Sequence, residues 1–483
     1  MTFLRCIQNR FGVLRLLLLG LVLVHGARAV HTDPSTGKLV RYSVRPRANS
    51  VTGNYLPPPT ADAWYKAPEG WQSAKPGDVL RIREHAYPTI NIPNAIDTFQ
   101  VLYRTSDSLD NASWSVATVY IPKSHRNCLP GSNATKSGCS HAMVVYDVPS
   151  DSVSPDAAPG YLLQFQEPYG EMRDMLARGW FIMVPDYEGP EAAFCAGVQA
   201  GHATLDATRA VLKVAGQFGL EMDRVKVGMW GYSGGAFAVG FASELAETYA
   251  PELVIDAAVV GGSSPNISKV DERMNKATTA GLFVTSLYGA TVQQPEAHAF
   301  LLKQLRTEGL YNKTKFLSAL TMTGAEVLGA FWQEDIFNYL ENGRDDFDNP
   351  IIQSAIDRDA VMGLHGTPRI PSFYYKAVYD ELSPVNETSV MIDDFCRHGA
   401  NILFHQNTIG GHNDELWTGR LRALDYLTAK LEGKVGNSSG VKMDIPATGC
   451  VTQTVSLPLE TLYLLPDWWW TTGPGLGQGL FPK

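Results

Sequence analysis

The sequence predicts an α/β fold in which a mostly parallel central sheet carries helices on both of its faces. Three observations predict it: a series of short apolar segments, helical stretches that alternate with them, and a glycine-rich strand–turn–helix sequence at residues 225–242. The chain has 483 residues, 45% hydrophobic and 18% charged, which is an ordinary globular composition with material for a large core. Length alone suggests about three domains, but α/β proteins often keep such lengths in one domain with insertions.

The predicted strands are short apolar runs, as expected for strands that are buried on both faces of a sheet. They cover residues 99–103, 115–121, 142–146, 180–185, 226–230, 257–260, 372–378 and 402–405. Helical stretches lie among them at residues 169–178, 203–216, 236–249 and 415–432. Because strand and helix alternate along the chain, we expect parallel strands with helices that cover the sheet.

One region breaks the alternation, since residues 266–365 contain helical segments only, at 278–288, 295–308 and 316–323 among others. We interpret this region as a helical cap inserted into the core. The predicted organisation is a signal peptide at 1–29, a first core part at 30–265, the cap at 266–365 and a second core part at 366–483. Residues 30–75 are Pro-rich and predict an irregular leader that wraps the core.

The C-terminal tail, residues 462–483, contains Trp468-Trp469-Trp470. Three interpretations stay open for it: a flap over the site, a contact with a lipid surface, or a packed end. Exposed tryptophans would favour contact with a surface.

The N-terminus has the pattern of a secretory signal peptide. Three arginines precede a short apolar stretch at residues 16–24, and Ala27-Arg28-Ala29 is a small-residue cleavage site. The apolar stretch is too short to span a bilayer comfortably, and no other segment is a transmembrane candidate. We expect a secreted, extracellular protein that begins near Val30. Its net charge of -9 gives no footprint for nucleic acid.

Cysteine usage agrees with an oxidising compartment. Removal of the signal peptide leaves Cys128, Cys139, Cys195, Cys396 and Cys450. Because five is an odd number, at least one of them stays outside any intramolecular pairing. Cys128 and Cys139 flank a polar loop and are a candidate pair, Cys396 and Cys450 are the next, and Cys195 is then a buried free thiol. No cysteine spacing is typical of zinc, and we predict neither a metal nor a cofactor.

Glycosylation sequons are numerous for a chain of this length. They occur at Asn111, Asn133, Asn266, Asn312, Asn386 and Asn437. Six sequons behind a signal peptide predict a secreted glycoprotein with these asparagines at the surface.

The strongest functional signal is Gly231-Tyr232-Ser233-Gly234-Gly235, which follows a predicted strand and precedes a helix of small and apolar residues. It fits the G-x-S-x-G nucleophile elbow, where a strand turns sharply into a helix with a serine at the tip. The glycines leave room for strand and helix to approach each other. Ser233 is therefore the candidate nucleophile, and the alternative is a tight turn without a catalytic role.

A catalytic serine needs an acid that orients its base, and in this arrangement the acid follows a late strand. Asp380 comes directly after the strand-like residues 372–379. Asp357, Asp359 and Asp393 compete, but none of them ends such a run.

The base is expected on a loop after the last predicted strand. His412 follows Gly410-Gly411 and precedes the last predicted helix, so we favour it over His398 and His405. The backbone N–H of Gly234 is one expected donor to the oxyanion. The second donor belongs to the loop at 147–160, where pattern alone does not choose a residue.

With these residues in place, the chain resembles the secreted fungal lipases of the lipase A type over roughly residues 59–432. The resemblance rests on Pro185-Asp186-Tyr187-Glu188-Gly189-Pro190, Gly201-His202-Ala203-Thr204-Leu205-Asp206, the elbow, Tyr379-Asp380-Glu381 and Gly399-Ala400-Asn401-Ile402. It implies an α/β-hydrolase fold and a lipase, with a cap whose apolar underside lines an acyl tunnel. It also implies acylglycerol substrates at a lipid–water interface, and we expect a monomer.

The resemblance further implies a catalytic triad of Ser233, Asp380 and His412, with Asp151 and Gly234 in the oxyanion hole. An ionised carboxylate would repel an oxyanion, so Asp151 must donate through its backbone N–H or keep its carboxyl protonated. A cysteine that some members carry after this aspartate is Ala157 here, so disulfide pairing does not carry over.

Two other functions stay open at the sequence level. One is an esterase for polar substrates, or a peptidase, on the same fold. The other is a binding protein on a hydrolase scaffold, although such proteins usually lose a triad member and every member has a candidate here.

Overall fold

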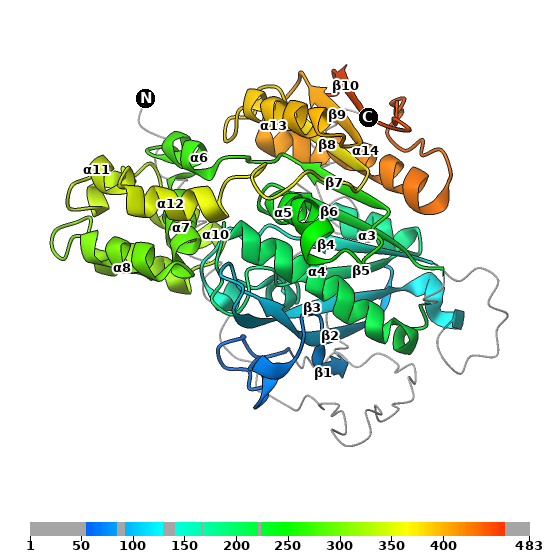
Figure 1. The fold of residues 1–483 in the computed structure, drawn as a ribbon, viewed down its shortest axis with the longest axis horizontal. Coiled ribbons are helices and arrows are strands. Elements are labelled where there is room, and N and C mark those ends of the chain that lie inside the picture. The colour runs from blue at the N-terminus through cyan, green and yellow to red at the C-terminus, as the bar shows by residue number, and fades with distance from the viewer. Residues whose placement is uncertain (1–54, 85–91, 129–140, 166–167, 221–223, 459–483) are drawn as a thin grey trace, which may run out of the picture.

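The central sheet organises the molecule. The structure is a computed structural model, and it describes residues 55–84, 92–128, 141–165, 168–220 and 224–458. Within these ranges one ten-stranded sheet has the order β1-β2-β3-β5-β4-β6-β7-β8-β9-β10. In Figure 1 it runs from β1 at the bottom to β10 at the top. Its strands are β1 (Val79–Glu84), β2 (Ala95–Ser106), β3 (Ala112–Pro122), β4 (Ala142–Asp147), β5 (Phe181–Pro185), β6 (Lys226–Tyr232), β7 (Ala257–Gly261), β8 (Ser372–Ala377), β9 (Ile402–Asn407) and β10 (Cys450–Val455).

The pairing is antiparallel at one end of the sheet and parallel in the rest. β1, β2, β3 and β5 pair antiparallel in that order. From β5 to β10 every neighbouring pair is parallel. The prediction of a mostly parallel sheet is therefore confirmed.

Two edge strands did not emerge from the sequence. β1 reads VLRIRE and mixes apolar with charged residues, while β10 reads CVTQTV and is nowhere fully buried. An edge strand has one neighbour and an exposed side, so it lacks the continuous apolar pattern of the central strands.

Helices cover both faces of the sheet. α4 (Gly197–Val214), α5 (Gly234–Tyr249) and α13 (Val385–Arg397) contribute to one apolar core, and α3 (Gly170–Ala177) and α14 (His412–Glu432) to the other. α13 was not predicted, although Met391, Ile392 and Phe395 give it a buried apolar stripe.

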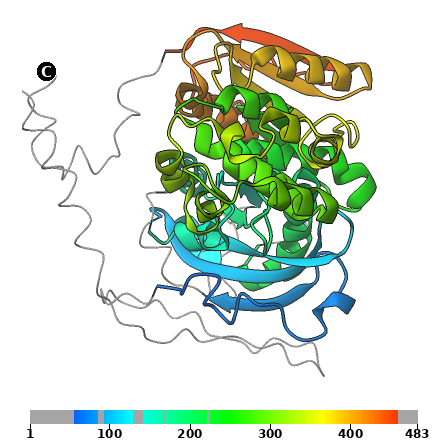
Figure 2. The same cartoon turned by 90° about the vertical axis from the view of Figure 1, so that its left-hand side faces the viewer.

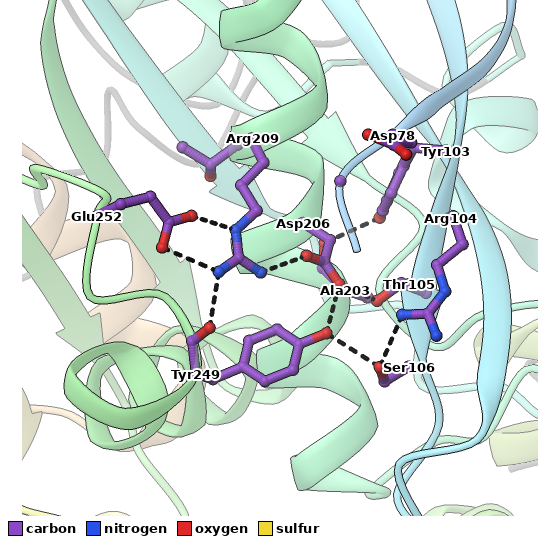
Figure 3. A network of polar contacts seen from close by, with 12 residues as sticks. Asp78, Tyr103, Arg104, Thr105, Ser106, Ala203, Asp206, Arg209, Tyr249 and Glu252 are labelled. Carbon is purple, nitrogen blue, oxygen red and sulfur yellow. Dashed lines mark hydrogen bonds and ion pairs between the residues drawn. The ribbon is translucent and has the colours of Figure 1, made fainter. Parts of the chain in front are cut away.

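A polar network joins α4 and α5 to β2 (Figure 3). The buried Asp206 carboxylate accepts hydrogen bonds from the Thr105 hydroxyl, the Tyr249 hydroxyl and the Arg209 guanidinium, at 2.7–2.8 Å. Arg209 also pairs with Glu252. Because both oxygens of Asp206 accept hydrogen bonds, the buried carboxylate ties α4 to β2 and α5 without an unsatisfied oxygen.

The segment between β7 and β8 is helical, as predicted for residues 266–365. Its helices are α6 (Ile267–Met274), α7 (Ala280–Val292), α8 (Pro295–Gln304), α9 (Lys313–Leu317), α10 (Gly324–Ala330), α11 (Arg344–Phe347) and α12 (Pro350–Asp359). They group to the left of the sheet in Figure 1 and stand in front of it in Figure 2. We call this group the cap. Its buried side chains, among them Phe283 and Tyr339, belong to the same apolar core as α4 and α5.

The cysteines follow part of the expected scheme. Cys396 on α13 and Cys450 on β10 form a disulfide, and Cys195 is a buried free thiol. Cys139 lies outside the described residues, and with it the proposed pair with Cys128. The signal peptide, most of the leader and the tail from residue 459 lie outside them too.

Five of the six sequons fall on described residues, and Asn133 does not. Asn111, Asn386 and Asn437 are exposed. Asn266 and Asn312 are half-buried, and their side chains accept hydrogen bonds at the first turns of α6 and α9. A search of the described ranges finds neither a helix long and apolar enough to cross a membrane nor a metal-binding group of His, Cys, Asp or Glu.

Candidate active site

Ser233 stands at a strained turn between β6 and α5. Its backbone has φ 54° and ψ -118°, a conformation that L-residues rarely adopt. Two glycines permit the turn: a Cβ on Gly231 would lie 2.1 Å from the Gly235 carbonyl oxygen, and a Cβ on Gly235 would lie 1.8 Å from the Asp147 carbonyl oxygen. The sequence motif therefore has the geometry of a nucleophile elbow, with its serine half-buried at the tip.

The structure brings the predicted acid, base and nucleophile into one chain of hydrogen bonds. His412 Nε2 lies 2.9 Å from Ser233 Oγ, and His412 Nδ1 lies 2.8 Å from Asp380 Oδ2. The three residues come from the end of β6, the loop after β8 and the first position of α14. Both distances are within hydrogen-bond range, so the imidazole can take a proton from the serine while the carboxylate orients it.

Main-chain contacts hold His412 in place. Its backbone N–H donates to Glu381 Oε2 at 2.8 Å, and its carbonyl oxygen accepts from the Tyr232 hydroxyl at 2.5 Å. Tyr232 directly precedes the serine, and Glu381 directly follows Asp380. Tyr232 and Glu381, each next to a candidate catalytic residue in the sequence, thus hold the backbone of His412.

Asp380 is buried and receives donors on both oxygens. Oδ1 accepts the backbone N–H groups of Leu382 and Ser383, while Oδ2 accepts His412 and lies 3.1 Å from Lys376 Nζ. Burial alone would raise the pKa of Asp380. The hydrogen bond and charge of His412, the charge of Lys376 and the Ser383 N–H outweigh it and lower this pKa to about 2.

The competing candidates lie elsewhere. His405 is buried in β9 and pairs with Gln453, while His398 is exposed after α13 and contacts the Asp394 carbonyl oxygen. Asp357 and Asp359 belong to the cap helix α12, and Asp393 belongs to α13. Neither of these histidines has a hydrogen bond to Ser233 in the described structure.

The predicted oxyanion residues lie side by side. Gly234 is the first residue of α5, where backbone N–H groups have no acceptor within the helix. A Cβ built on it would lie 3.4 Å from Asp151 Oδ1. Asp151 is half-buried with a φ of 54°, and burial, opposed by the charge of His412, raises its pKa to about 6.

A second acid lies behind Asp151. Glu188 is buried and accepts a hydrogen bond from the Ser150 hydroxyl at 2.5 Å. Burial raises its pKa to about 8; the Ser150 bond opposes this rise, and the charges of Asp151 and Asp186 add to it. The oxyanion side of the site thus contains two carboxyl groups whose environments favour the protonated form.

A pocket opens from Ser233 toward the cap. Ser233, Gly234, Asp151 and Glu188 are among its lining residues. Its apolar lining includes Phe194, Phe237, Ile267, Val270, Met274 and Leu282. Cys195 and Ser286 also line it, and Cys195 belongs at the same time to the apolar core.

Four residues of the site were missed from the sequence. Lys376 is a single cation inside the apolar strand SFYYKA, and that isolation was a usable signal. Glu188 belongs to the motif at residues 185–190, and an acidic side chain shortly after an apolar strand was a second usable signal. Tyr232 and Glu381 act through contacts with His412 that only the folded loops create.

Comparison with known proteins places this chain among ester hydrolases. The sequence model of a family described as "Secretory lipase" matches residues 163–438. A trichothecene C-3 esterase of Fusarium sporotrichioides is 37% identical over 409 residues, covering 83% of this chain and 88% of its own. Lipase A of Arthroderma benhamiae is 33% identical over 448 residues, 88% of each chain.

Solved structures agree with this result. Candida antarctica lipase A in its closed state superposes with a TM-score of 0.67 at 26% identity, covering 82% of this chain and 91% of that one. A rice cell wall degrading esterase from Xanthomonas oryzae, at 13% identity and a TM-score of 0.55, shares the fold alone.

Proposed function

This chain belongs to the secretory lipase family and is a carboxylic ester hydrolase of the α/β-hydrolase fold. We propose that it is a secreted lipase and that it acts through an acyl-enzyme on Ser233. The observation that carries the proposal is the chain of two hydrogen bonds from Ser233 through His412 to Asp380. Such a chain of nucleophile, base and orienting acid recurs on unrelated folds.

In the proposed reaction, His412 Nε2 takes the proton of Ser233 as the serine oxygen attacks the ester carbonyl carbon. The resulting imidazolium is stabilised by the ionised carboxylate of Asp380. His412 then donates this proton to the leaving alcohol as the acyl-enzyme forms. A water molecule attacks the acyl-enzyme in the same way, and its proton passes through His412 back to Ser233.

The negative charge on the tetrahedral oxygen needs donors that are already in position. We assign this role to the backbone N–H of Gly234 and to the Asp151 carboxyl, whose Oδ1 faces the first residue of α5. Because its pKa is raised to about 6, this carboxyl is protonated in mildly acid solution and can donate.

The pocket supports an acyl group as its occupant. Its apolar lining includes residues of α5 and of the cap helices α6 and α7, together with Phe194 ahead of α4, and Ser233 is among its lining residues. An acyl chain that enters it would remove apolar surface from water, worth roughly 0.8 kcal/mol for each buried CH₂ group. Acylglycerols are therefore the proposed substrates, in agreement with relatives that are named lipases.

A second candidate substrate is the ester of a trichothecene. The relative of 37% identity is a trichothecene C-3 esterase, and another at 35% is a probable trichothecene esterase. The pocket of this chain also carries Ser286 and Ser264, which would offer polar contacts to a compact oxygenated group.

Secretion is part of the proposal. It is supported by the signal-peptide pattern at residues 1–29, by six sequons and by the match to a secretory family. Recovery of the protein from culture medium, with a molecular mass that falls on treatment with an endoglycosidase, would test this part.

The function is tested by Ser233→Ala, with Ser438→Ala at an exposed serine as the matched control. Ser233→Ala is expected to abolish hydrolysis of acylglycerols and labelling by a fluorescent organophosphonate, while the control keeps both. Full activity in Ser233→Ala would end the proposal. Triacylglycerols of short and long chains, compared with trichothecene C-3 esters by kcat/KM, decide between the two substrate classes.

A further inference from the structure

A buried lysine touches the orienting acid of the proposed triad. Lys376 lies on β8, four residues before Asp380, and its side chain is 1% exposed. Its Nζ lies 3.1 Å from Asp380 Oδ2, the oxygen that also accepts His412 Nδ1. The ammonium further donates to the Ser263 carbonyl oxygen at 2.5 Å, after β7.

Resting on the proposed function, we propose that Lys376 is a positioning residue whose buried charge fixes Asp380 and lets His412 remain an unprotonated base in more acid solution. It touches neither the substrate nor the reacting atoms. It acts through the carboxylate, by contact and by charge.

The contact limits the freedom of the carboxylate. Backbone N–H groups hold Oδ1, and Lys376 and His412 share Oδ2. With donors on both oxygens, the plane of the carboxylate has one orientation, and that orientation aims Oδ2 at the imidazole. A buried carboxylate with fewer donors would be able to turn away.

The charge opposes protonation of the histidine. In a simple pair, an aspartate stabilises the imidazolium with its full negative charge. Here a second cation, Lys376, contacts the same oxygen, so the carboxylate stabilises the imidazolium form of His412 less. The neutral imidazole is the form that accepts the serine proton, and Lys376 therefore extends its range toward lower pH.

The surroundings of Lys376 support a charged amine. Burial lowers its pKa, but the charge and hydrogen bond of Asp380 and the charges of Glu387 and Glu381 raise it in part. Glu387 on α13 pairs with Lys269, and Thr388 on the same helix presents a neutral hydroxyl near Ser263. The acids around Lys376 thus favour its ammonium form.

Three variants separate charge from packing. Lys376→Met removes the charge and the donor, Lys376→Gln removes the charge but keeps a donor, and Lys376→Arg keeps the charge. Lys213→Met is the matched control, since Lys213 also binds a carboxylate, Asp78, and a backbone carbonyl, but it is half exposed on α4. The measurement is kcat/KM against pH, with melting temperature recorded for each variant.

The expected result sorts the variants by charge. The acid limb of kcat/KM moves up by about one to two pH units in Lys376→Met and Lys376→Gln, and stays at its wild-type position in Lys376→Arg and Lys213→Met. Lys376→Met also loses more kcat than Lys376→Gln, because only the latter can hold Oδ2. For a variant with a lowered melting temperature, kcat/KM is measured well below that temperature.

Two results would overturn the inference. One is an unmoved acid limb in a folded neutral variant, which would leave Lys376 a structural ion pair between β8 and the chain after β7. The other is an equal shift in Lys376→Arg, which would trace the effect to packing. Neither touches the proposed function, which fails only if Ser233→Ala keeps activity.

Discussion

Two aspartates flank Ser233, and the structure gives them opposite protonation behaviour. Asp380 has a pKa lowered to about 2, whereas Asp151 has a pKa raised to about 6. Burial raises the pKa of both. The difference comes from their neighbours, because Asp380 meets His412, Lys376 and two backbone donors, while the cationic influence on Asp151 comes from His412 alone.

The two proposed roles need different charge states of the same kind of side chain. An imidazolium needs an anion beside it, and an oxyanion needs a neutral donor. The ammonium of Lys376 favours the first state on one side of the serine. Burial of Asp151, against the charge of His412 alone, favours the second state on the other. The three predictions below alter one side at a time.

The largest effect is expected from Asp380→Asn. The amide keeps the shape of the carboxylate but offers no anion, and its NH₂ group favours the wrong tautomer of His412. Loss of about 10⁴-fold in kcat is expected, as for the same change in other triads. Stopped assays of ester hydrolysis at a fixed pH would measure it.

Asp357→Asn is the matched control, because Asp357 is an exposed aspartate on the cap helix α12 and was a competing candidate in the sequence. It should keep wild-type kcat. If Asp380→Asn lost less than tenfold, the proposed role of Asp380 would be wrong.

A smaller effect is expected on the oxyanion side, from changes at Asp151. With a pKa of about 6, its donor form is present below pH 6 and is lost as pH rises through that value. Asp151→Ala should lower kcat by about 10²- to 10³-fold in mildly acid solution. Asp151→Asn keeps a neutral donor at every pH, so its kcat should stay near wild type at pH 5 and not fall above pH 6.

The pair of variants also decides which group of Asp151 donates. If the backbone N–H were the donor, Asp151→Ala would keep its kcat, because that change leaves the backbone group in place. Profiles of kcat from pH 4 to 9 for the wild type and both variants distinguish these outcomes.

The sequence predicted the features that depend on local geometry: the central strands, the turn at Ser233, and the chain order of Asp380 and His412. The central strands are buried on both faces, so they read as continuous apolar runs. The elbow needs glycine at Gly231 and Gly235 because other atoms occupy the space of a Cβ. Asp380 and His412 follow in the order that the fold requires, each in the segment after a strand that could be located.

What the sequence did not reveal depends on contacts between distant segments. The Tyr232 hydroxyl meets the His412 carbonyl across 180 positions. Whether a buried Asp becomes an anion or a neutral acid depends on which side chains face it, and no local pattern contains that information. Lys376 is the exception, because a cation in a fully buried strand indicates that a polar or anionic partner lies nearby, even when that partner is not identified.

The smallest effect is expected from Glu188→Gln, and it concerns stability. The pKa of Glu188 is about 8 in the folded protein against 4.5 for the free side chain. The folded state therefore binds a proton that the unfolded state releases between these values. The contribution to stability is complete below pH 4.5, and it is lost as pH rises through 8.

Glutamine is neutral at every pH and can still accept the Ser150 hydrogen bond, so Glu188→Gln escapes this loss. Its melting temperature should equal that of the wild type near pH 4 and exceed it by about 2 to 5 °C at pH 8. Glu247→Gln, at an exposed glutamate paired with Arg369, should show no such dependence. An equal difference at both pH values would mean that Glu188 is ionised in the folded protein. The two sides of the serine would then differ less in charge than their pKa values indicate.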